Sequence, residues 1–380
     1  MTHKTKESST EIHVAIVLPF LNEQETLANT CRSLGFGMGT NSTPRSATLF
    51  LIDNGSTDGS ADIAKQVKGD TLDGRVVIGY EPELGYVPPR HRGNMMVRAF
   101  ARSTDRGEHD VLILQADADT QYDDGYIEGM RSVMQANGAN VLVEACTDYP
   151  PDFKAEYPAY IQLCDRVDKV FAELFAPPAA DVIVDDKVSG YRLDNYFGWG
   201  GHQREYAASS GEIHAETSRL YMKARTKGAE RVPVDSALAY PSLRKVLQEP
   251  ALHFASAGFP REASWNEKWR ETYSGPTTID DFCYNISHPE VQRAIQVREQ
   301  HLIAIFSVLP IHVNNSIKEI IAPEISDLTA VVLPLLPKRT IDDLAHGPSL
   351  FISDVFELIE CHGIELLSEC RRLIATIPRP

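Results

Sequence analysis

Several features that would assign the chain to a common class of protein are missing from its sequence. The six cysteines among 380 residues include no pair separated by two residues, so the usual spacing of a structural zinc site is absent. A membrane-spanning helix needs about 20 apolar residues, and the longest apolar stretch, 328–336, is far shorter. Basic residues are in the minority, and the formal net charge is −16. Because general nucleic-acid binding needs a basic surface, we do not expect a nucleic-acid partner.

The N-terminal residues 1–10 are polar and lack the apolar core of a signal peptide. The cysteines are scattered through apolar surroundings, which is typical of reduced, buried thiols. We therefore expect a cytoplasmic protein without a transmembrane segment. Because the chain is acidic, an anionic substrate must meet a local positive centre, such as a metal ion or an arginine cluster.

Strand and helix patterns alternate over the first 150 residues. Short runs of aliphatic residues predict five strands with helical stretches between most of them, at 13–18, 48–52, 75–80, 111–114 and 140–144. Such alternation predicts an α/β fold with a mostly parallel central sheet flanked by helices. The middle of the chain is less regular, with one clear helix expected at 213–227, and the pattern becomes helical again from about residue 288.

Two carboxylates follow the fourth expected strand. Asp117 and Asp119 come directly after the apolar run 111–114. Alternate residues of a strand point the same way, so we expect both carboxylates to converge on one hard cation. Oxygen ligands at a loop edge suit Mg²⁺ or Mn²⁺, which usually also contact a substrate phosphate. The alternative is a pair of solvated loop acids, but uncompensated acids directly after a buried strand are costly.

Three motifs, in this order, resemble family 2 glycosyltransferases: VLPFLNE at 17–23, IDNGSTDGS at 52–60, and the DAD motif at 117–119. The resemblance implies the GT-A fold and metal-dependent, inverting transfer from a nucleotide-sugar, with a UDP-sugar expected and GDP- or dTDP-sugars as alternatives. It is strong over 12–150 and weak over 191–253. The C-terminal residues resemble no family that we can name.

The resemblance also implies roles for individual residues. Pro19, Asn22 and Glu23 should line the nucleotide pocket, and Asp53 should bind the base, in the family usually uracil, through a charge-assisted hydrogen bond. Asp119 should be the direct ligand of Mn²⁺ or Mg²⁺ through the donor diphosphate. Asp117 should contact the ribose or the metal.

Each of these assignments has a simpler alternative. Asn22, with Glu25 three residues later, also fits the cap of a helix that extends to Leu34. Asp53 and Asp58 fit turns in which the side chain bonds its own backbone.

A basic segment follows the third expected strand. The family often has a loop with Arg and Asn there, facing the nucleotide, which points to Arg92 and Asn94. An arginine also suits diphosphate recognition in an acidic protein. The alternative is the solvated start of a basic helix.

Inverting transfer needs a carboxylate that deprotonates the acceptor hydroxyl. The family places this base at the start of a helix, usually in an acidic pair after a Gly-rich stretch. Here the pair is replaced by Glu216-Thr217, so Glu216 is the first candidate and Glu212 the second, four residues apart on one helical face. Both could instead be solvated acids favoured by the helix dipole. His253 is a candidate to complete the metal shell, or else a core histidine.

These assignments divide the chain into a GT-A catalytic domain at 11–285 and a helical C-terminal extension at 286–380. Within the catalytic domain, 11–150 should bind the nucleotide and 151–285 should bind the acceptor. The expected partners are a nucleotide-sugar donor and a carbohydrate or glycoconjugate acceptor. The C-terminal helices could pair two chains, or equally pack on the catalytic domain.

Three other functions fit the sequence less well. The glycines at 35–39 have part of the spacing of a dinucleotide-binding loop but follow a helix, so Gly35 fits a helix stop better. A nucleotidyltransferase would need a Gly-rich basic loop after the first strand, and none is present. An inactive glycosyltransferase domain that serves as a scaffold is the non-enzyme alternative.

Overall fold

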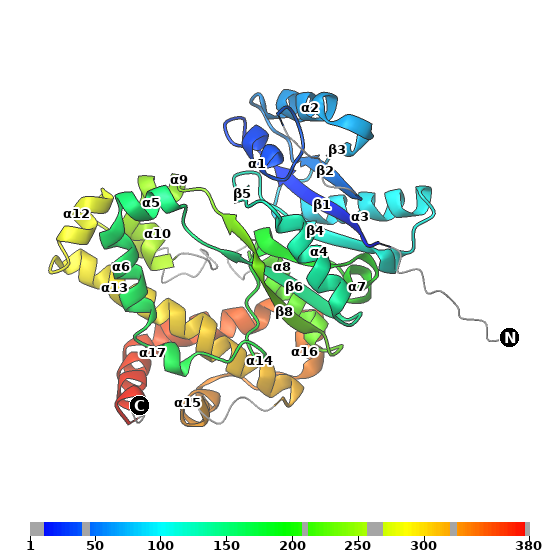
Figure 1. The fold of residues 1–380 in the computed structure, drawn as a ribbon. Coiled ribbons are helices and arrows are strands. Elements are labelled where there is room, and N and C mark those ends of the chain that lie inside the picture. Colours follow the sequence, from blue (N-terminus) through cyan, green and yellow to red (C-terminus); the bar gives the residue numbers. More distant parts are fainter. Residues whose placement is uncertain (1–10, 40–45, 207–211, 257–268, 320–324, 377–380) are drawn as a thin grey trace. The chain divides into compact units, whose positions relative to one another are not determined.

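A computed structural model describes residues 11–39, 46–206, 212–256, 269–319 and 325–376 (Figure 1). Contacts within the chain group it into two compact units. The first, here called the sheet unit, comprises Met1–Thr147, Asp186–Gly201 and Val232–Tyr240. The second, here called the helical unit, comprises Asp148–Asp185, His202–Arg231 and Pro241–Pro380. Residue 150, where we expected the nucleotide-binding part to end, lies three residues after the first segment of the sheet unit ends at Thr147. Residue 285, where we expected the catalytic domain to end, lies within the helical unit.

The sheet unit contains one eight-stranded sheet of order β3-β2-β1-β4-β7-β6-β8-β5. Its strands are β1 (His13–Phe20), β2 (Ala47–Asp53), β3 (Val76–Tyr80), β4 (Val111–Gln115), β5 (Gln121–Tyr122), β6 (Val141–Thr147), β7 (Ser189–Arg192) and β8 (Glu230–Tyr240). The pairs β3-β2, β2-β1 and β1-β4 are parallel, as expected. The pairs β4-β7, β7-β6 and β8-β5 are antiparallel, so the sheet is mixed. The α/β class is confirmed.

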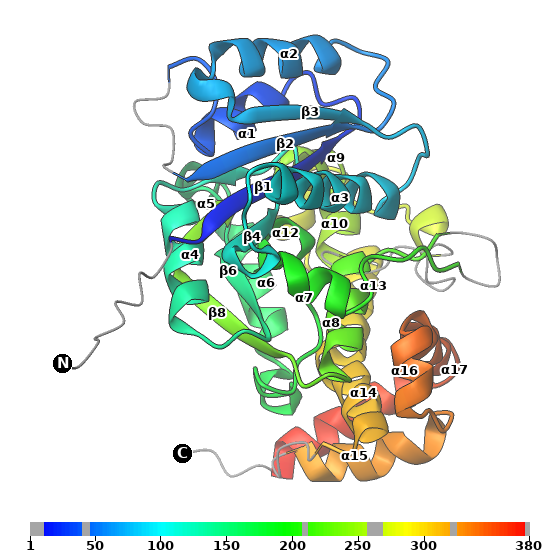
Figure 2. The same ribbon diagram turned by 90° about the vertical axis from the view of Figure 1, so that its right-hand side faces the viewer.

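The five helices of the sheet unit are α1 (Leu27–Ser33), α2 (Ser60–Asp70), α3 (Val87–Ser103), α4 (Tyr126–Ala136) and α7 (Leu193–Gly198), counting α-helices among the described residues. Alternate residues of β1 face opposite sides of the sheet. Ile16 and Leu18 belong to the apolar core that includes residues of α1, α2 and α4. Val17 faces the other side, where Gly93 lets α3 approach the strand closely. Helices therefore cover both faces of the parallel strands (Figure 2).

The helical unit contains α5 (Pro151–Glu156), α6 (Pro158–Asp168), α8 (Glu216–Arg225), α9 (Arg244–Gln248), α10 (Pro250–Ser256), α12 (Ile279–Tyr284), α13 (Pro289–Ile303), α14 (Leu309–Ile317), α15 (Ser326–Val332), α16 (Ile341–His346) and α17 (Ser349–Thr376). One apolar cluster joins α6, α10, α12 and α13. A second joins α13, α14, α15 and α17 to Met222 of α8. Among the described residues, α13 belongs to both clusters, so the helices after it share apolar packing with the helices before it.

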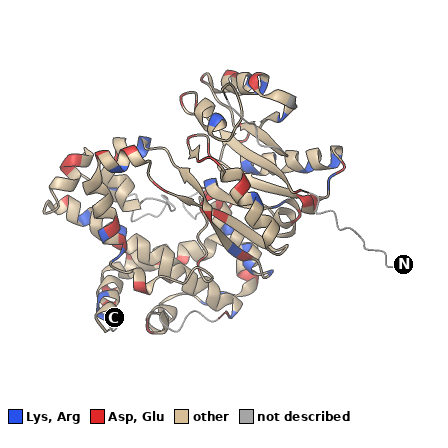
Figure 3. Ribbon diagram, viewed as in Figure 1, with Lys and Arg blue, Asp and Glu red and all other residues tan. Residues whose placement is uncertain are grey.

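Charged residues are interspersed along the elements of each unit (Figure 3). Within the described residues, no helix is both long enough and apolar enough to cross a membrane. None of the six cysteines, all of which are among the described residues, forms a disulfide bond. Four are buried as expected, but Cys146 and Cys361 are exposed, which corrects that expectation for these two. Burial raises the pKa of Cys31 to about 12, so this thiol stays protonated.

Candidate functional site

Two loops interlock at the carboxyl ends of β1 and β2. Asn22 adopts a left-handed backbone conformation, with φ at 54°. Its side-chain Oδ1 accepts a hydrogen bond from the Thr57 amide at 2.8 Å, and its own amide donates to Ser56 Oγ at 3.1 Å. The expectation that Asn22 caps a helix is wrong, because α1 begins only at Leu27. The Asn22 carboxamide instead holds the loop after β1 to the loop after β2.

Glu23 and Pro19 lie beside this junction. The Glu23 amide donates to Ser60 Oγ at 2.8 Å, and its carboxylate accepts from Thr26 Oγ1 at 2.9 Å. Pro19 pairs with Ile52 in the β1-β2 register and is partly exposed. Both residues therefore lie at the edge of the sheet where the parallel strands end, which is where α/β folds bind ligands.

Asp53 is the last residue of β2 and is partly exposed. Its Oδ1 accepts a hydrogen bond from the Ser56 amide at 2.8 Å, so the turn chemistry considered as an alternative is present. Asp58 likewise accepts from the Ser60 hydroxyl and amide, and the hydrogen bond from Ser60 Oγ lowers the pKa of its carboxyl. One oxygen of the Asp53 carboxylate thus accepts the hydrogen bond that forms the turn, and the carboxylate lies at the carboxyl end of β2.

Asn54 is a structural residue that sequence analysis did not single out. It is only 3% exposed, and its carboxamide donates to the carbonyls of Glu81 at 2.9 Å and Glu83 at 2.7 Å. These bonds fix the loop after β3 against the loop after β2. Leu84 and Tyr86 in that loop are exposed.

The DAD motif at 117–119, here called the acidic motif, follows the end of β4 and lies in a turn. This corrects the expectation that its two carboxylates lie on a strand. β4 ends at Gln115, and Ala118 and Asp119 form the turn that follows. Alternation along a strand therefore gives no reason for the two carboxylates to point the same way. Both Asp117 and Asp119 are partly exposed.

A buried arginine holds the first carboxylate of the motif. Arg90 Nη2 donates to Asp117 Oδ1 at 2.6 Å, and the Arg90 side chain is 7% exposed. Arg90 Nη1 also donates to Gln115 Oε1 at 3.3 Å. Sequence analysis chose Arg92 and Asn94 from this segment and missed Arg90. No signal in the sequence singles it out, because its partner Asp117 lies 27 positions away in the chain.

Asn94 and Arg92 occupy different environments. Asn94 is fully buried, where it accepts from Gln115 Nε2 at 3.1 Å and donates to the Tyr191 hydroxyl at 3.2 Å. Gln115 Nε2 also donates to the same hydroxyl at 2.8 Å. Asn94 thus supports Gln115, and through it Arg90, which does not fit the expected contact with the nucleotide. Arg92 is exposed.

The carboxylates of the acidic motif are hard oxygen donors of the kind that Mg²⁺ and Mn²⁺ prefer. Among the described residues, no group of three or more His, Cys, Asp and Glu has the arrangement of a metal site. Mg²⁺ is commonly held by one or two protein carboxylates together with substrate phosphates and water. Asp117 and Asp119 fit a cation held in this way, and do not fit an all-protein metal cage.

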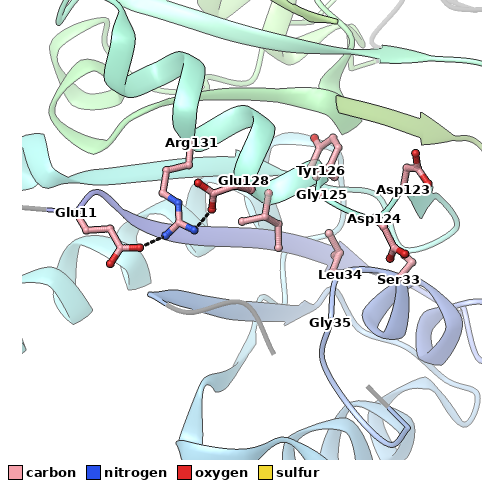
Figure 4. A pocket seen from close by; sticks show the side chains of 11 residues that line it. Glu11, Ser33, Leu34, Gly35, Asp123, Asp124, Gly125, Tyr126, Glu128 and Arg131 are labelled. Atoms are coloured by element: carbon pink, nitrogen blue, oxygen red, sulfur yellow. Dashed lines mark hydrogen bonds and ion pairs between the residues drawn. The ribbon is translucent and has the colours of Figure 1, made fainter. Parts of the chain in front are cut away.

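A cavity of about 470 Å³ lies elsewhere in the sheet unit, between the end of α1 and the start of α4 (Figure 4). Arg131 projects into it and forms ion pairs with Glu11, at 2.6 Å, and with Glu128. Asp123 and Asp124 lie at its other end. None of the candidate donor-binding, metal or catalytic residues predicted from the sequence lines this cavity.

The expected catalytic carboxylates lie in the helical unit. Glu216 is the first residue of α8 and is 4% exposed. Glu212 precedes the helix, forms an isolated β-bridge with Tyr206, and accepts from Arg204 Nη2 at 2.9 Å. The expectation that the two acids share one helical face is therefore wrong. Glu216 is also too buried to be a solvated first-turn acid.

His253 is in α10, where it is partly buried. Its amide donates to the Glu249 carbonyl at 2.8 Å. The third member of the expected metal shell thus belongs to the helical unit, whereas Asp117 and Asp119 belong to the sheet unit.

Comparison with known proteins gives the family. Residues 15–174 match the sequence model of glycosyl transferase family 2. The chain contains a family 2 glycosyltransferase domain. The match includes all three motifs, from VLPFLNE to Asp119, and confirms the resemblance that they indicated. With the α/β sheet, it also confirms the expected fold class.

Three solved structures show more distant similarity to this chain. A mannosyltransferase from Pyrobaculum calidifontis, in complex with GDP-Man and Mn²⁺, is 13% identical with a TM-score of 0.47, covering 95% of this chain and 88% of that one. S. aureus TarS 1–349 is 13% identical with a TM-score of 0.41, covering 92% of each chain. GalNAc-T7 with UDP, GalNAc and Mn²⁺ is 15% identical with a TM-score of 0.43, and the match covers 87% of this chain and 59% of that one. No curated protein matches the sequence.

Proposed function

We propose that the chain is a metal-dependent, inverting glycosyltransferase that moves a sugar from a nucleotide-sugar, preferably a UDP-sugar, to a hydroxyl of a carbohydrate or glycoconjugate. One observation carries the proposal. In a family 2 glycosyltransferase domain, the buried Arg90 binds Asp117 of the acidic motif, beside the carboxyl ends of β1 and β4. Asp53 ends the neighbouring strand β2.

The sheet unit would bind the donor. Asp53 would accept a hydrogen bond from the base, with Pro19, Asn22 and Glu23 along the pocket and the exposed Arg92 beside the diphosphate. A carboxylate that accepts from a base N–H makes a charge-assisted bond, which is stronger than a neutral one. Exposed apolar side chains of Leu84 and Tyr86 would cover the base plane.

The acidic motif would hold the cation. Asp119 would be its direct ligand, because Arg90 already takes one oxygen of Asp117. Asp117 would contact the ribose or the cation through its other oxygen. When bound, Mn²⁺ or Mg²⁺ supplies positive charge that stabilises the departing diphosphate.

Glu216 would act as the base. In the proposed step, the acceptor oxygen attacks the anomeric carbon, a new C–O bond forms, and the C–O bond to the diphosphate breaks with its electron pair leaving on the diphosphate. The Glu216 carboxylate takes the proton of the acceptor hydroxyl. Attack from the face opposite the leaving group inverts the anomeric configuration. Glu212 is the second candidate for this base.

A panel of UDP-, GDP- and dTDP-sugars tests the proposal, with and without Mn²⁺ and with simple glycosides as acceptors. Release of the nucleoside diphosphate is followed by chromatography, and the anomeric configuration of the product by NMR. We expect one donor to be consumed in a metal-dependent way and to give a product of inverted configuration. A retained configuration, or nucleotide binding without turnover of any donor, would contradict the proposal.

A further inference from the structure

The helix that begins with Glu216 is unusual because it is charged and buried at the same time. All ten residues of α8 are buried, including Arg219, Lys223 and Arg225. Burying a charge is costly unless it is paired and hydrogen-bonded. These side chains therefore need specific partners. The partners show which segment each arginine or lysine side chain holds in place.

Arg219 binds both sides of the segment that leads into α8. Its Nη1 donates to the Gln203 carbonyl at 2.8 Å and to Glu205 Oε1 at 2.9 Å. Its Nη2 donates to the Ile213 carbonyl at 2.8 Å, and its Nε to the His214 carbonyl at 3.2 Å. The side chain is only 2% exposed. One guanidinium thus joins residues 203–205 to residues 213–214, the two that directly follow Glu212.

The same segment is also paired along its backbone. The Ile213 amide donates to the Glu205 carbonyl at 2.9 Å, and Tyr206 pairs with Glu212 in an antiparallel bridge. Arg204 holds the Glu212 carboxylate. Residues 203–206 and 212–214, here called the Arg219 clamp, therefore form one fixed unit that ends two residues before Glu216.

Glu205 connects the clamp to the C-terminal helix. Its Oε1 accepts from Arg219, and its Oε2 accepts from the amide of Ser349, the first residue of α17, at 2.9 Å. A carboxylate at a helix N-terminus satisfies an amide that has no partner within the helix. The C-terminal helix is thereby tied to the segment that carries the candidate bases.

From these contacts we infer that Arg219 is a positioning residue for Glu216 and Glu212, and that Glu205 makes this positioning depend on the first turn of α17. The inference rests on the proposed function, in which one of these two acids is the catalytic base. It gives the C-terminal helices a role in turnover that does not require them to touch the substrate.

Arg225 provides a matched control on the same helix. It is also buried, and it donates to the Ala179 carbonyl at 3.0 Å and to Asn314 Oδ1 at 2.9 Å, with Glu319 as its ion-pair partner. None of these partners belongs to the Arg219 clamp. Arg219→Lys and Arg225→Lys therefore remove comparable hydrogen bonds from one helix, and only the first affects the clamp. Lysine keeps the charge but cannot reproduce the planar fork of arginine.

The experiment measures both variants by thermal unfolding, by UDP and Mn²⁺ binding, by amide hydrogen exchange at 212–216, and by turnover of the donor found in the sugar panel. We expect both variants to lower the melting temperature and to leave UDP binding within about twofold of the wild type. Only Arg219→Lys should speed exchange at 212–216 and lower kcat by about tenfold or more, because small misplacements of a catalytic group are costly. Glu205→Gln should reproduce the loss of kcat in a milder form, and it serves as the second variant if Arg219→Lys does not fold.

Three results would overturn the inference. If both arginine variants lowered kcat equally, or if exchange at 212–216 did not change, Arg219 would have no special positioning role. If exchange rose and kcat did not fall, the clamp would be real but would carry no catalytic group. Failure of the proposed function is recognised separately, since the wild type would then turn over no donor in the panel.

Discussion

Arg90 Nη2 lies 2.6 Å from Asp117 Oδ1, although the two residues are 27 positions apart in the chain. Arg90→Gln should weaken Mn²⁺-dependent UDP binding by about 10- to 100-fold, the range found when residues that orient a metal ligand are removed. Isothermal titration of UDP in the presence of Mn²⁺ measures the effect.

Arg98→Gln is the matched control for Arg90→Gln. Arg98 lies on the same helix, α3, and forms an ion pair of the same length, 2.6 Å, with Glu108. It contacts no residue of the acidic motif, so UDP affinity should stay at the wild-type value. If the two variants bound UDP equally well, Arg90 would not orient Asp117 for binding.

Glu216→Gln should leave UDP binding unchanged and lower kcat by at least about 10²-fold, the lower end of what a general base contributes. Single-turnover kinetics with saturating donor separate the chemical step from binding. Glu212→Gln is the parallel variant, with a smaller expected effect, since Glu212 is paired with Arg204. If Glu216→Gln kept most of its activity and Glu212→Gln lost it, the base would be Glu212.

Gly93→Ala should destabilise the protein. A Cβ at this position would lie 2.3 Å from Cγ1 of Val17, a buried and stiff side chain on β1. Overpacking of this kind costs about 1–3 kcal/mol in the free energy of unfolding. Urea unfolding followed by circular dichroism measures it.

Gly69→Ala is the control for that substitution. Gly69 is in α2, exposed, and a Cβ there would meet nothing within 4 Å. Alanine in a helix is favoured over glycine by about 0.5–1 kcal/mol, so this variant should be at least as stable as the wild type. Equal stability of the two alanine variants would mean that α3 does not pack against β1 as closely as described.

Stability should fall as the pH drops from about 6.5 towards 4. Burial lowers the pKa of His13 to about 4 and that of His301 to about 3. In this window the unfolded chain binds a proton at each histidine and the folded chain does not, so the free energy of unfolding rises with pH. The loss on going from pH 7.5 to 5 is about 2 kcal/mol for each histidine.

His301→Leu tests the pH dependence directly. The variant should show a weaker loss of stability between pH 7.5 and 5 than the wild type, in urea titrations at the two pH values. His346→Gln, which replaces an exposed histidine, should keep the wild-type dependence. A wild-type protein equally stable at both pH values would contradict the prediction.

The parallel half of the sheet was predictable from the sequence because three of its four strands, β1, β2 and β4, are buried on both faces. Each of the three contains an uninterrupted apolar run, such as residues 14–18 in β1. β7 and β8 were not predicted. β7 has only four residues, and β8 contains Pro233 and alternates polar with apolar residues without a clean pattern. Their pairing depends on contacts far along the chain, which local pattern does not report.

The sequence predicted which types of residue lie at the candidate site, but it predicted fewer of the contacts that these residues make. Asp53 and the acidic motif lie at strand ends, as expected, because motif and strand are adjacent in sequence. The role of Arg90, the burial of Asn94 and the loop contact of Asn22 all depend on partners at least 20 residues away. The Arg219 clamp likewise joins segments that no sequence motif connects.

The central claim is metal-dependent transfer from a nucleotide-sugar by the acidic motif, and Asp119→Ala tests it most directly. Release of nucleoside diphosphate from the donor panel is measured with wild-type protein and with the variant, each with Mn²⁺ and with a chelator. We expect the wild type to release nucleoside diphosphate from one donor only when Mn²⁺ is present. Asp119→Ala should lose that release and bind UDP more weakly in the presence of Mn²⁺. Release that is equal in the variant, or unaffected by the chelator, would contradict the account.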